Sequence, residues 1–534
     1  MKIATEDFGR IEVTDVPLPD HLRDVTATYT FSGKVFVLYR TDEHPRSEDW
    51  YHAAVLNDDG TDFTNIFSGP IPEHPKANGI RHMPFADNRR VLLGDYVLEC
   101  SPDIDTCTRA ELVAVEYPWG LEQDPMTSHH WSEIIVSADN EHIAWTILRN
   151  DMGAAVALGH LTRAHDRYII EDPVVISSTE RFAADPGREG CVVPLPIRGG
   201  EVKQFVRGGT AISSAGGKNA FLTDSVVQDL TTDEVVRVTR TPGYDETTIF
   251  SPDERLGLVM TSRASQRTDP AVLGLVPRPH GILSGMDLAW IVYQYAVSGV
   301  RSFREGNIGP VLIDIERSMS EPGYQGVALN DPDESWVYVS PMSWHPSGRK
   351  AMWPEMLRGS ERPGVYRQIR VRVAHLVDHE PSAPVPVRPT PLAVPYGMAG
   401  EAAERVLRGP AEHLRAGRIA GQHSGHLDFE SQPGNFSEGL AASVTTTYVD
   451  YSDDGRTFYN GWERTLSSFA AESVYAADLD VTGDESGEMS LRATWSSLRD
   501  GTRLLFGPAE DGLPKSHGFA RYGGQVLKVE DLAE

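Results

Sequence analysis

The stretch Thr247–Arg263, TTIFSPDERLGLVMTSR, decides the fold expected for this chain. Its first four residues, TTIF, are β-branched or aromatic and favour the pleated surface of a strand. Ser251–Glu254 (SPDE) is typical of a tight turn, because proline presets φ and serine and aspartate bond to nearby backbone groups. Leu256, Leu258 and Met260 then alternate with other residues, the period of a second strand. Since a lone hairpin is marginal in water, this one must belong to a larger sheet.

Variants of this hairpin recur along most of the chain. Each has an apolar strand, a turn of the Ser-Pro/Ala-Asp-Gly/Asn type and a second apolar strand, at Tyr29–Arg40, His82–Asp95, His130–Arg149, Ser340–Glu355 and Thr446–Trp462, with weaker copies at Ile212–Leu222 and Ala493–Gly507. Further strands are expected between them, at Ala155–Thr162, Tyr168–Ile176 and, as a pair, Ser225–Arg240. Four strands per unit, repeated six to eight times, are typical of a β-propeller.

The repeated turn resembles that of the TolB-type family, also called PD40 or WD40-like, over about residues 25–505. The resemblance implies an all-β fold: one propeller domain spanning residues 1–534, with seven four-stranded blades, or eight as the alternative. We expect the strand Arg10–Val16 to complete the last blade, which would close the ring and remove its free edge.

Two regions break the repeat and are expected to be loop and helical insertions that pack on the ring, at about 264–330 and 381–440. The first contains PRPHGILSGMDLAW and the glycine-rich GNIGPVLID. The second opens with a proline-rich stretch, residues 381–396, which predicts a stiff extended linker. Helical spacing follows in Glu401–Arg418. Long insertions in a compact domain are often functional.

The composition limits the partners and the location of the protein. A net charge of −28 repels nucleic acid and anionic membranes. We therefore expect no nucleic acid or membrane partner, and a small-molecule or oligosaccharide ligand instead. No apolar run is long enough for a transmembrane helix, and the first residues lack the apolar core of a signal peptide. These features predict a cytoplasmic protein.

Three cysteines are present, and two of them, Cys100 and Cys107, flank the segment SPDIDT. They could meet across a hairpin. In a cytoplasmic protein, however, two free thiols are the expected state. No C-x-x-C pair occurs, which excludes a zinc ribbon.

The repeat geometry also predicts where a ligand would bind. The starts of the first strands and the ends of the second strands lie on the rim opposite the Ser-Pro-Asp-Gly turn, at the mouth of the central channel. First-strand starts contribute Arg81, His82, His129, His130, Asp245, Glu246 and Tyr448. Second-strand ends contribute Asp95, Arg149, Arg263, Glu355 and Trp462.

Several histidines at this mouth are candidate metal ligands. His82 and His129 or His130, with Asp245 and Glu246, could hold a divalent metal ion from different blades. A neutral histidine could instead act as a general base, or these groups could bond one another and water in a polar channel. A second group, His423, His426 and Asp428, could ligate a metal or form a polar loop over the mouth.

Absent motifs narrow the class of enzyme. No G-x-S-x-G is present, which argues against a prolyl-oligopeptidase-type peptidase. Neither a P-loop nor a dinucleotide-binding fingerprint after a strand is found.

The family resemblance extends to activity, because some TolB-type propellers are oligogalacturonate lyases with a metal at the channel mouth. It implies a lyase in which a uronate carboxylate binds to arginines, as guanidinium groups suit. The hypothetical site has substrate-binding Arg81, Arg149, Arg263 and Trp462, a base at His82 or His130, a proton donor at Tyr448, and metal ligands among His129, His423 and His426. Two alternatives stay open: a glycoside hydrolase using Asp245, Glu246 or Glu355, and a non-catalytic binding or scaffold propeller.

Overall fold

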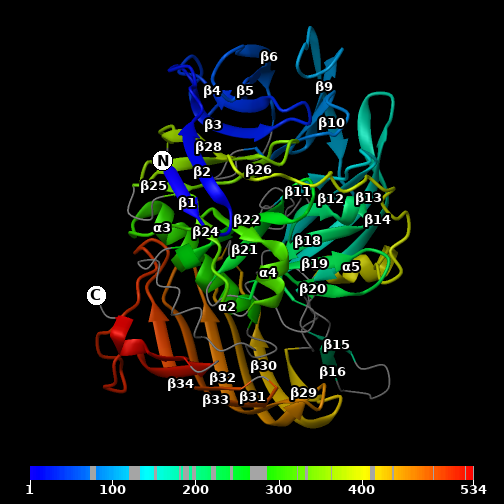
Figure 1. Cartoon of the computed structure of the whole chain (residues 1–534). Helices are drawn as coiled ribbons and strands as arrows, with labels where there is room; N and C mark the ends of the chain where they lie inside the picture. Colours follow the sequence, from blue (N-terminus) through cyan, green and yellow to red (C-terminus); the bar gives the residue numbers. More distant parts are fainter. Residues whose placement is uncertain are drawn as a thin grey trace.

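The computed structural model describes residues 1–534 except 73–79, 120–132, 150–152, 180–181, 185–191, 195–199, 218–223, 241–243, 265–284, 322, 331–334, 363, 409–414, 436–437, 485, 523–524 and 533–534. Figure 1 shows two parts, a ring of short sheets drawn blue to green and a large C-terminal sheet drawn yellow to red. A helical segment lies between them.

Six blades form the ring among the described residues, and the outer strands of blades B and C pair to make one continuous eight-stranded sheet. Blade A comprises β3 (Arg23–Tyr29), β4 (Val35–Arg40), β5 (Trp50–Leu56) and β6 (Thr64–Pro70). Blade B comprises β7 (His82–Pro84), β8 (Arg90–Leu93), β9 (Tyr96–Ser101) and β10 (Arg109–Glu116). Blade C comprises β11 (Ile134–Val136), β12 (His142–Leu148), β13 (Ala154–Arg163) and β14 (Arg167–Ser178). Blade D comprises β17 (Glu201–Val206), β18 (Ala211–Ala215), β19 (Ser225–Asp229) and β20 (Val235–Arg237). Blade E comprises β21 (Asp245–Phe250), β22 (Leu256–Thr261), β23 (Val311–Asp314) and β24 (Val327–Ala328).

Blade F closes the ring with a strand from the other end of the chain. Its inner strand is split into β25 (Trp336–Tyr338) and β26 (Ser343–Trp344), followed by β27 (Lys350–Leu357) and β28 (Ile369–Leu376). The N-terminal β2 (Gly9–Asp15) pairs antiparallel with β28, and β1 (Lys2–Thr5) pairs with β2. The prediction that the N-terminal strand completes the last blade is confirmed.

Contacts between successive inner strands run around the full circle, from blade A to blade F and back to β3. Separate apolar clusters fill the spaces between neighbouring blades, as between A and B or between C and D. Ring strands such as β4 and β22 are buried on both faces, because each blade packs between two others. The all-β propeller class is thereby confirmed.

The number of blades in the ring differs from the expected seven. The hairpin Thr446–Trp462 belongs instead to an eight-stranded antiparallel sheet made of β29 (Ala416–Ala420), β30 (Ser424–Gln432), β31 (Ala442–Ser452), β32 (Thr457–Ser467), β33 (Ser473–Gly483), β34 (Gly487–Trp495), β35 (His517–Tyr522) and β36 (Gln525–Lys528). Blade F packs directly on β3 of blade A, so no blade from the C-terminal sheet lies between them. The strands of this sheet alternate between buried and exposed residues, as expected for a sheet with one solvated face.

Two weaker hairpins were misplaced. In blade D the inner hairpin is β17–β18, which turns at Arg207–Thr210, so Ile212–Leu222 is not the repeat unit. Residues Ala493–Gly507 leave β34 and form turns with one isolated bridge, between Trp495 and Leu504. The remaining hairpins and the intervening strands are confirmed.

The first insertion connects β22 to β23 and carries α2 (Gly285–Val292), a π-helix, η5 (Tyr293–Ser298), and α3 (Gly299–Ser302). The helix α2 packs on β31 and β32 of the C-terminal sheet, and α3 contacts β25 of blade F. One continuous apolar core therefore joins blades E and F, this helical segment and the buried face of the C-terminal sheet. A short α4 (Ile315–Ser320) follows β23.

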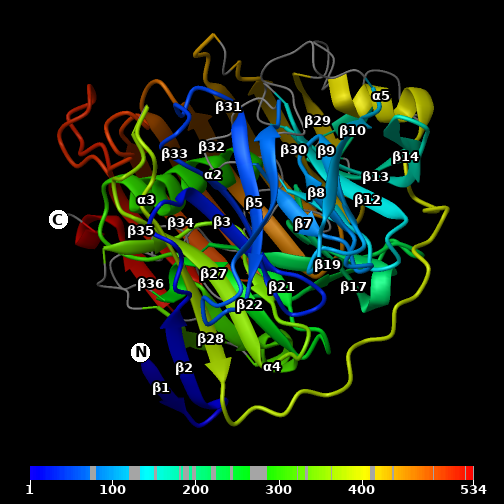
Figure 2. The same ribbon diagram turned by 90° about the horizontal axis from the view of Figure 1, so that it is seen from above.

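The proline-rich stretch is an extended strap along the turn rim of the ring, visible as the yellow line in Figure 2. Its backbone amides at Val385, Arg388 and Thr390 bond in succession to the inner-hairpin turns of blades E, D and C. The chain then forms α5 (Gly400–Arg408), which packs on blade C, and passes to the C-terminal sheet.

The cysteine prediction is wrong, because Cys100 and Cys107 form a disulfide in the structure. The antiparallel pairing of β9 with β10 brings the segment after Cys100 back on itself, with the two Cα atoms 5.3 Å apart. Disulfides are typical of oxidising surroundings, so a cytoplasmic location stays an untested prediction. Among the described helices, none combines the length and the apolar character needed to cross a membrane.

Ring closure can be tested on β2. Ile11 is fully buried, so we expect Ile11→Ala to lower the free energy of unfolding by about 2–5 kcal/mol through lost packing and a cavity. The exposed Thr14 on the same strand is the control, and Thr14→Ala should change stability by no more than about 0.5 kcal/mol. Equal effects in chemical denaturation would contradict the closure.

Candidate channel site

Charged side chains converge where the innermost strands begin. Arg81 precedes β7, Glu133 precedes β11, Glu201 and Lys203 lie on β17, and Glu246 lies on β21. These five residues, from blades B, C, D and E, are called the channel cluster below. They occupy the rim opposite the Ser-Pro-Asp-Glu turn, where the sequence predicts the ligand to bind.

Lys203 is the centre of the channel cluster. Its ammonium nitrogen lies 2.6 Å from Glu201 Oε2 and 2.8 Å from Glu246 Oε1. The Tyr244 hydroxyl donates a short hydrogen bond to the other oxygen of Glu246. Across the channel, Arg81 Nη2 lies 3.1 Å from Glu133 Oε1. Two cations and three carboxylates are thus held together, so the cluster has one more acidic group than basic groups.

The two carboxylates on Lys203 have divergent proton affinities. Burial, offset in part by Lys203 but reinforced by Glu246, raises the pKa of Glu201 to about 7. Burial acts in the same direction on Glu246, but Lys203 and the hydrogen bonds from Glu201, Lys203 and Tyr244 outweigh it and lower its pKa to about 2. Below about pH 7 the pair therefore holds one proton, on Glu201, while Glu246 is ionised. Pairs of carboxyl groups with separated pKa values are the arrangement used for general acid and base roles.

The helical insertion covers this end of the channel. Tyr293, at the start of the π-helix, interacts electrostatically with Glu246, Glu201 and Arg81, and burial raises its pKa. Arg301 of α3 donates from Nε to the Tyr338 carbonyl on the inner strand of blade F, at 3.2 Å. π-Helical turns are frequent at functional sites. The channel cluster thus combines residues of four blades with Tyr293 of the insertion.

Despite lying on inner strands, the cluster keeps accessible surface. The side chain of Glu201 is 24% exposed and that of Glu133 is 20% exposed, whereas Lys203 is 2% exposed. Glu201 and Glu133 therefore each present part of their side chain to solvent, whereas Lys203 is buried.

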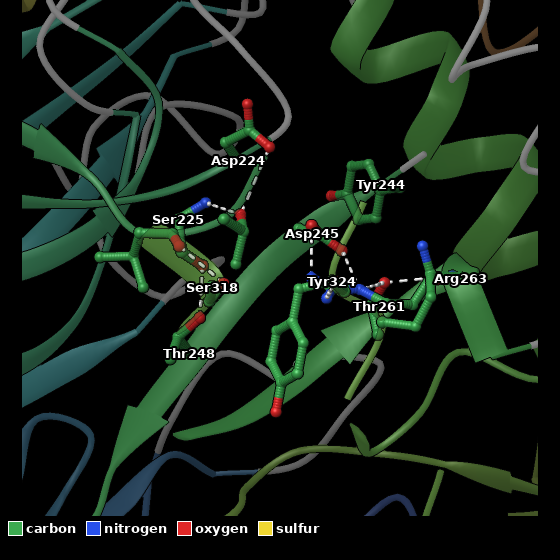
Figure 3. Close-up of polar contacts among 12 residues, drawn as sticks. Asp224, Ser225, Tyr244, Asp245, Thr248, Thr261, Arg263, Ser318 and Tyr324 are labelled. Atoms are coloured by element: carbon green, nitrogen blue, oxygen red, sulfur yellow. Dashed lines mark hydrogen bonds and ion pairs between the residues drawn. The ribbon is translucent and has the colours of Figure 1, made fainter. Parts of the chain in front are cut away.

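Asp245 and Arg263 are brought together, but in a buried ion pair beside the cluster. Arg263 Nη2 lies 2.7 Å from Asp245 Oδ2, and Nε also contacts Thr261 Oγ1. Figure 3 shows this pair tying the start of β21 to the end of β22, next to Tyr244. Because successive residues of a strand alternate in direction, Asp245 turns away from the side taken by Tyr244 and Glu246.

His82 does not reach the channel. It lies between blades A and B, with Nε2 3.0 Å from Thr26 Oγ1 and Nδ1 3.4 Å from Thr28 Oγ1. Burial, helped by the charge of Arg81, lowers its pKa to about 3. The imidazole is therefore neutral at physiological pH.

Two further predicted residues hold structural elements in place. Arg149 donates from Nη1 to the Val406 carbonyl, at 2.7 Å, and so attaches α5 to blade C. Glu355, fully buried in blade F, accepts from Trp353 Nε1 at 2.8 Å and pairs with Arg370 at 2.6 Å. Neither is among the contacts of the channel cluster. Asp95 lies in the turn between β8 and β9.

Tyr448 and Trp462 belong to the C-terminal sheet rather than to a blade. The Tyr448 hydroxyl donates to the buried Glu463 at 2.7 Å, in the apolar core beneath the helical insertion. Trp462 is 41% exposed, on the solvated face of β32.

The second histidine group does not form a metal site. His423 lies in the turn before β30, against Phe458, while His426 Nε2 is 3.9 Å from Asp428, which is itself held by Arg418. Within the described part of the chain, no three His, Cys, Asp or Glu residues are placed to bind a metal ion. His129 and His130 lie outside the described residues.

Sequence reasoning missed Glu133, Glu201, Lys203, Tyr244 and Tyr293. The rule of first-strand starts also applies to Glu133, which directly precedes β11. It selects Glu201 only when the hairpin of blade D is placed at β17–β18. The turn of this hairpin is Arg-Gly-Gly-Thr. Because it lacks the Ser-Pro-Asp-Gly pattern, the repeat search did not identify the hairpin.

The fold defines a β-propeller carrying a C-terminal antiparallel sheet. No family model and no curated protein sequence matches the chain. Solved structures similar to it include a putative TolB from Agrobacterium tumefaciens, 12% identical over 55% of this chain and 73% of that one, with a TM-score of 0.29.

An α-L-arabinanase from Penicillium chrysogenum, complexed with arabinobiose, is 9% identical over 71% of this chain and 99% of that one, with a TM-score of 0.34. The WD40 domain of SCAP from fission yeast is 8% identical over 89% of this chain and 98% of that one, with a TM-score of 0.28. At this level of similarity the matches decide nothing about activity.

The raised pKa of Glu201 predicts a pH-dependent stability. A carboxyl group whose pKa rises from 4.5 in the unfolded chain to about 7 on folding stabilises the protein below pH 4.5, and this contribution is lost as the pH rises through 7. Glutamine cannot titrate. We therefore expect the fall in Tm between pH 5 and pH 8 to be several degrees smaller in Glu201→Gln than in the unsubstituted protein, measured by calorimetry. The exposed Asp428→Asn is the control, and a matching change in that variant would refute the assignment.

Proposed function

We propose that this protein is a carbohydrate-active propeller that hydrolyses glycosidic bonds at the channel cluster. The observation that carries the proposal is the pair of carboxylates on Lys203, of which Glu201 is protonated and Glu246 ionised below about pH 7. Glycoside hydrolysis needs a proton donor for the leaving oxygen and a carboxylate that acts on the anomeric carbon.

In this mechanism Glu201 donates its proton to the glycosidic oxygen as the bond to the anomeric carbon breaks. Glu246 attacks that carbon and forms a glycosyl ester. Water then hydrolyses the ester, and Glu201 takes up the proton of the water. Both carboxylates contact one nitrogen and a hydrogen bond links them, so they lie too close for the water that an inverting mechanism places between the two groups. The Tyr244 hydroxyl bond and the Lys203 charge keep Glu246 ionised for attack.

The geometry supports a hydrolase better than the lyase suggested by the family resemblance. A lyase needs a base and a carboxylate-binding arginine in one place, but His82 is held by threonines and Arg149 and Arg263 are engaged elsewhere. Among the lyase residues that the structure describes, Arg81 is the one that joins the channel cluster.

The test is a panel of neutral and uronic-acid glycans, followed both by new reducing ends and by the absorbance of unsaturated products. We expect new reducing ends without unsaturated product, and a loss of activity as the pH rises through 7, because Glu201 then loses its proton. Glu201→Gln and Glu246→Gln should each lower kcat by at least about 100-fold. The surface variant Asp428→Asn should retain activity.

Other outcomes separate the alternatives. Unsaturated product would favour the lyase. Binding without turnover, unchanged in both glutamine variants, would favour a non-catalytic propeller and would overturn the role of the pair.

A further inference from the structure

A second place in the ring can bind a ligand, away from the channel cluster. Two adjoining cavities, of about 250 Å³ and about 490 Å³, lie in the cleft between blade A and the segment that joins β27 to β28 in blade F. Both cavities are lined by Asp24 and Arg367, so they meet at this pair.

The smaller cavity is rich in arginine although the protein is strongly acidic overall. Arg40, Arg46 and Arg367 line it, and Asp24 is the carboxylate shared by Arg46 and Arg367. Arg40 instead donates to the backbone carbonyls of Arg46 and Glu48 and to the Tyr51 hydroxyl. Arg46 Nε lies 3.1 Å from one oxygen of Asp24, and Arg367 Nε lies 2.9 Å from the other. Asp24 is the one acidic residue among those that line this cavity, and on the neighbouring loop Asp42 pairs with Arg23 and Glu48 with His44. The cavity therefore holds more positive than negative charge.

Arg367 is a buried part of this excess positive charge. Its side chain is 3% exposed, and its Nε donates to Asp24. Its two terminal nitrogens, Nη1 and Nη2, make no hydrogen bond to any residue that the structure describes. Arg40 is also buried, stacked 4.1 Å over the Tyr51 ring with one terminal nitrogen on two backbone carbonyls. Burying guanidinium groups is costly unless their charge is matched. An anion among these arginines supplies the match.

The larger cavity suits the rest of such a ligand. Trp336, Tyr366 and Val365 line it, on the far side of the Asp24–Arg367 pair. Aromatic side chains provide a flat apolar surface with a polar edge, on which a sugar ring or a similar body can lie.

We propose that this cleft binds a small ligand through a carboxylate or phosphate group, which sits among Arg40, Arg46 and Arg367 while the remainder lies against Trp336. Planar guanidinium groups bind both oxyanions with paired, charge-assisted hydrogen bonds. The site is separate from the channel cluster, and its occupation does not depend on the hydrolase proposal.

The experiment measures binding of three probes to the full chain by calorimetry: galacturonate, inorganic phosphate and galactose. We expect saturable binding of galacturonate, of phosphate or of both, and none of galactose. Whichever anion binds identifies the group that the ligand carries. Arg367→Gln should weaken binding by about tenfold or more, the effect of losing a charge-assisted hydrogen bond. Arg418→Gln, an equal loss of charge on the exposed face of the C-terminal sheet, should leave binding unchanged.

Because Arg367 also holds Asp24, a measurement on the unsubstituted chain accompanies the variant. Arginine modification by phenylglyoxal, read by mass spectrometry, should slow at Arg46 when the binding anion is present and stay constant at Arg418. Saturation by neither anion, equal binding of galactose, or no protection of Arg46 would overturn the proposal.

Discussion

A single ammonium group, that of Lys203, determines how the centre of the ring can be built. Its contacts with Glu201 and Glu246 allow two carboxylates to lie together in a channel from which most water is excluded. Without the lysine, both groups would be driven toward their neutral forms, since burial disfavours a charge. With it, the proton is confined to Glu201 and the negative charge to Glu246. The chemistry proposed for the channel depends on this division.

The positions of the blades follow from the ring closure between β2 and β28, which sets the inner strands in a circle and covers their edges. The strap of proline-rich chain lies along one rim, and the helical insertion with the C-terminal sheet covers the other. The arginines of the cleft lie apart from both rims, between blades A and F.

Local patterns predicted most of the hairpins, because strand propensity and turn chemistry act within about a dozen residues. They did not separate ring blades from the C-terminal sheet, since Thr446–Trp462 has the same local pattern as Thr247–Arg263 and differs in its edge partner. For the site, strand position selected Arg81 and Glu246, which the structure places in the channel cluster. It could not foresee that Asp245 and Arg263 pair with each other, or that Tyr293 is brought in by an insertion, because these contacts arise from tertiary packing.

The most direct test of this account is infrared difference spectroscopy of the carboxyl groups between pH 5 and pH 9. The carbonyl stretching band of a protonated carboxyl group should be present at pH 6, disappear as the pH rises through about 7, and be absent from Glu201→Gln. If the same band persists in Glu201→Gln, or if no carboxyl group of the protein titrates near neutral pH, the division of the proton between Glu201 and Glu246 is wrong.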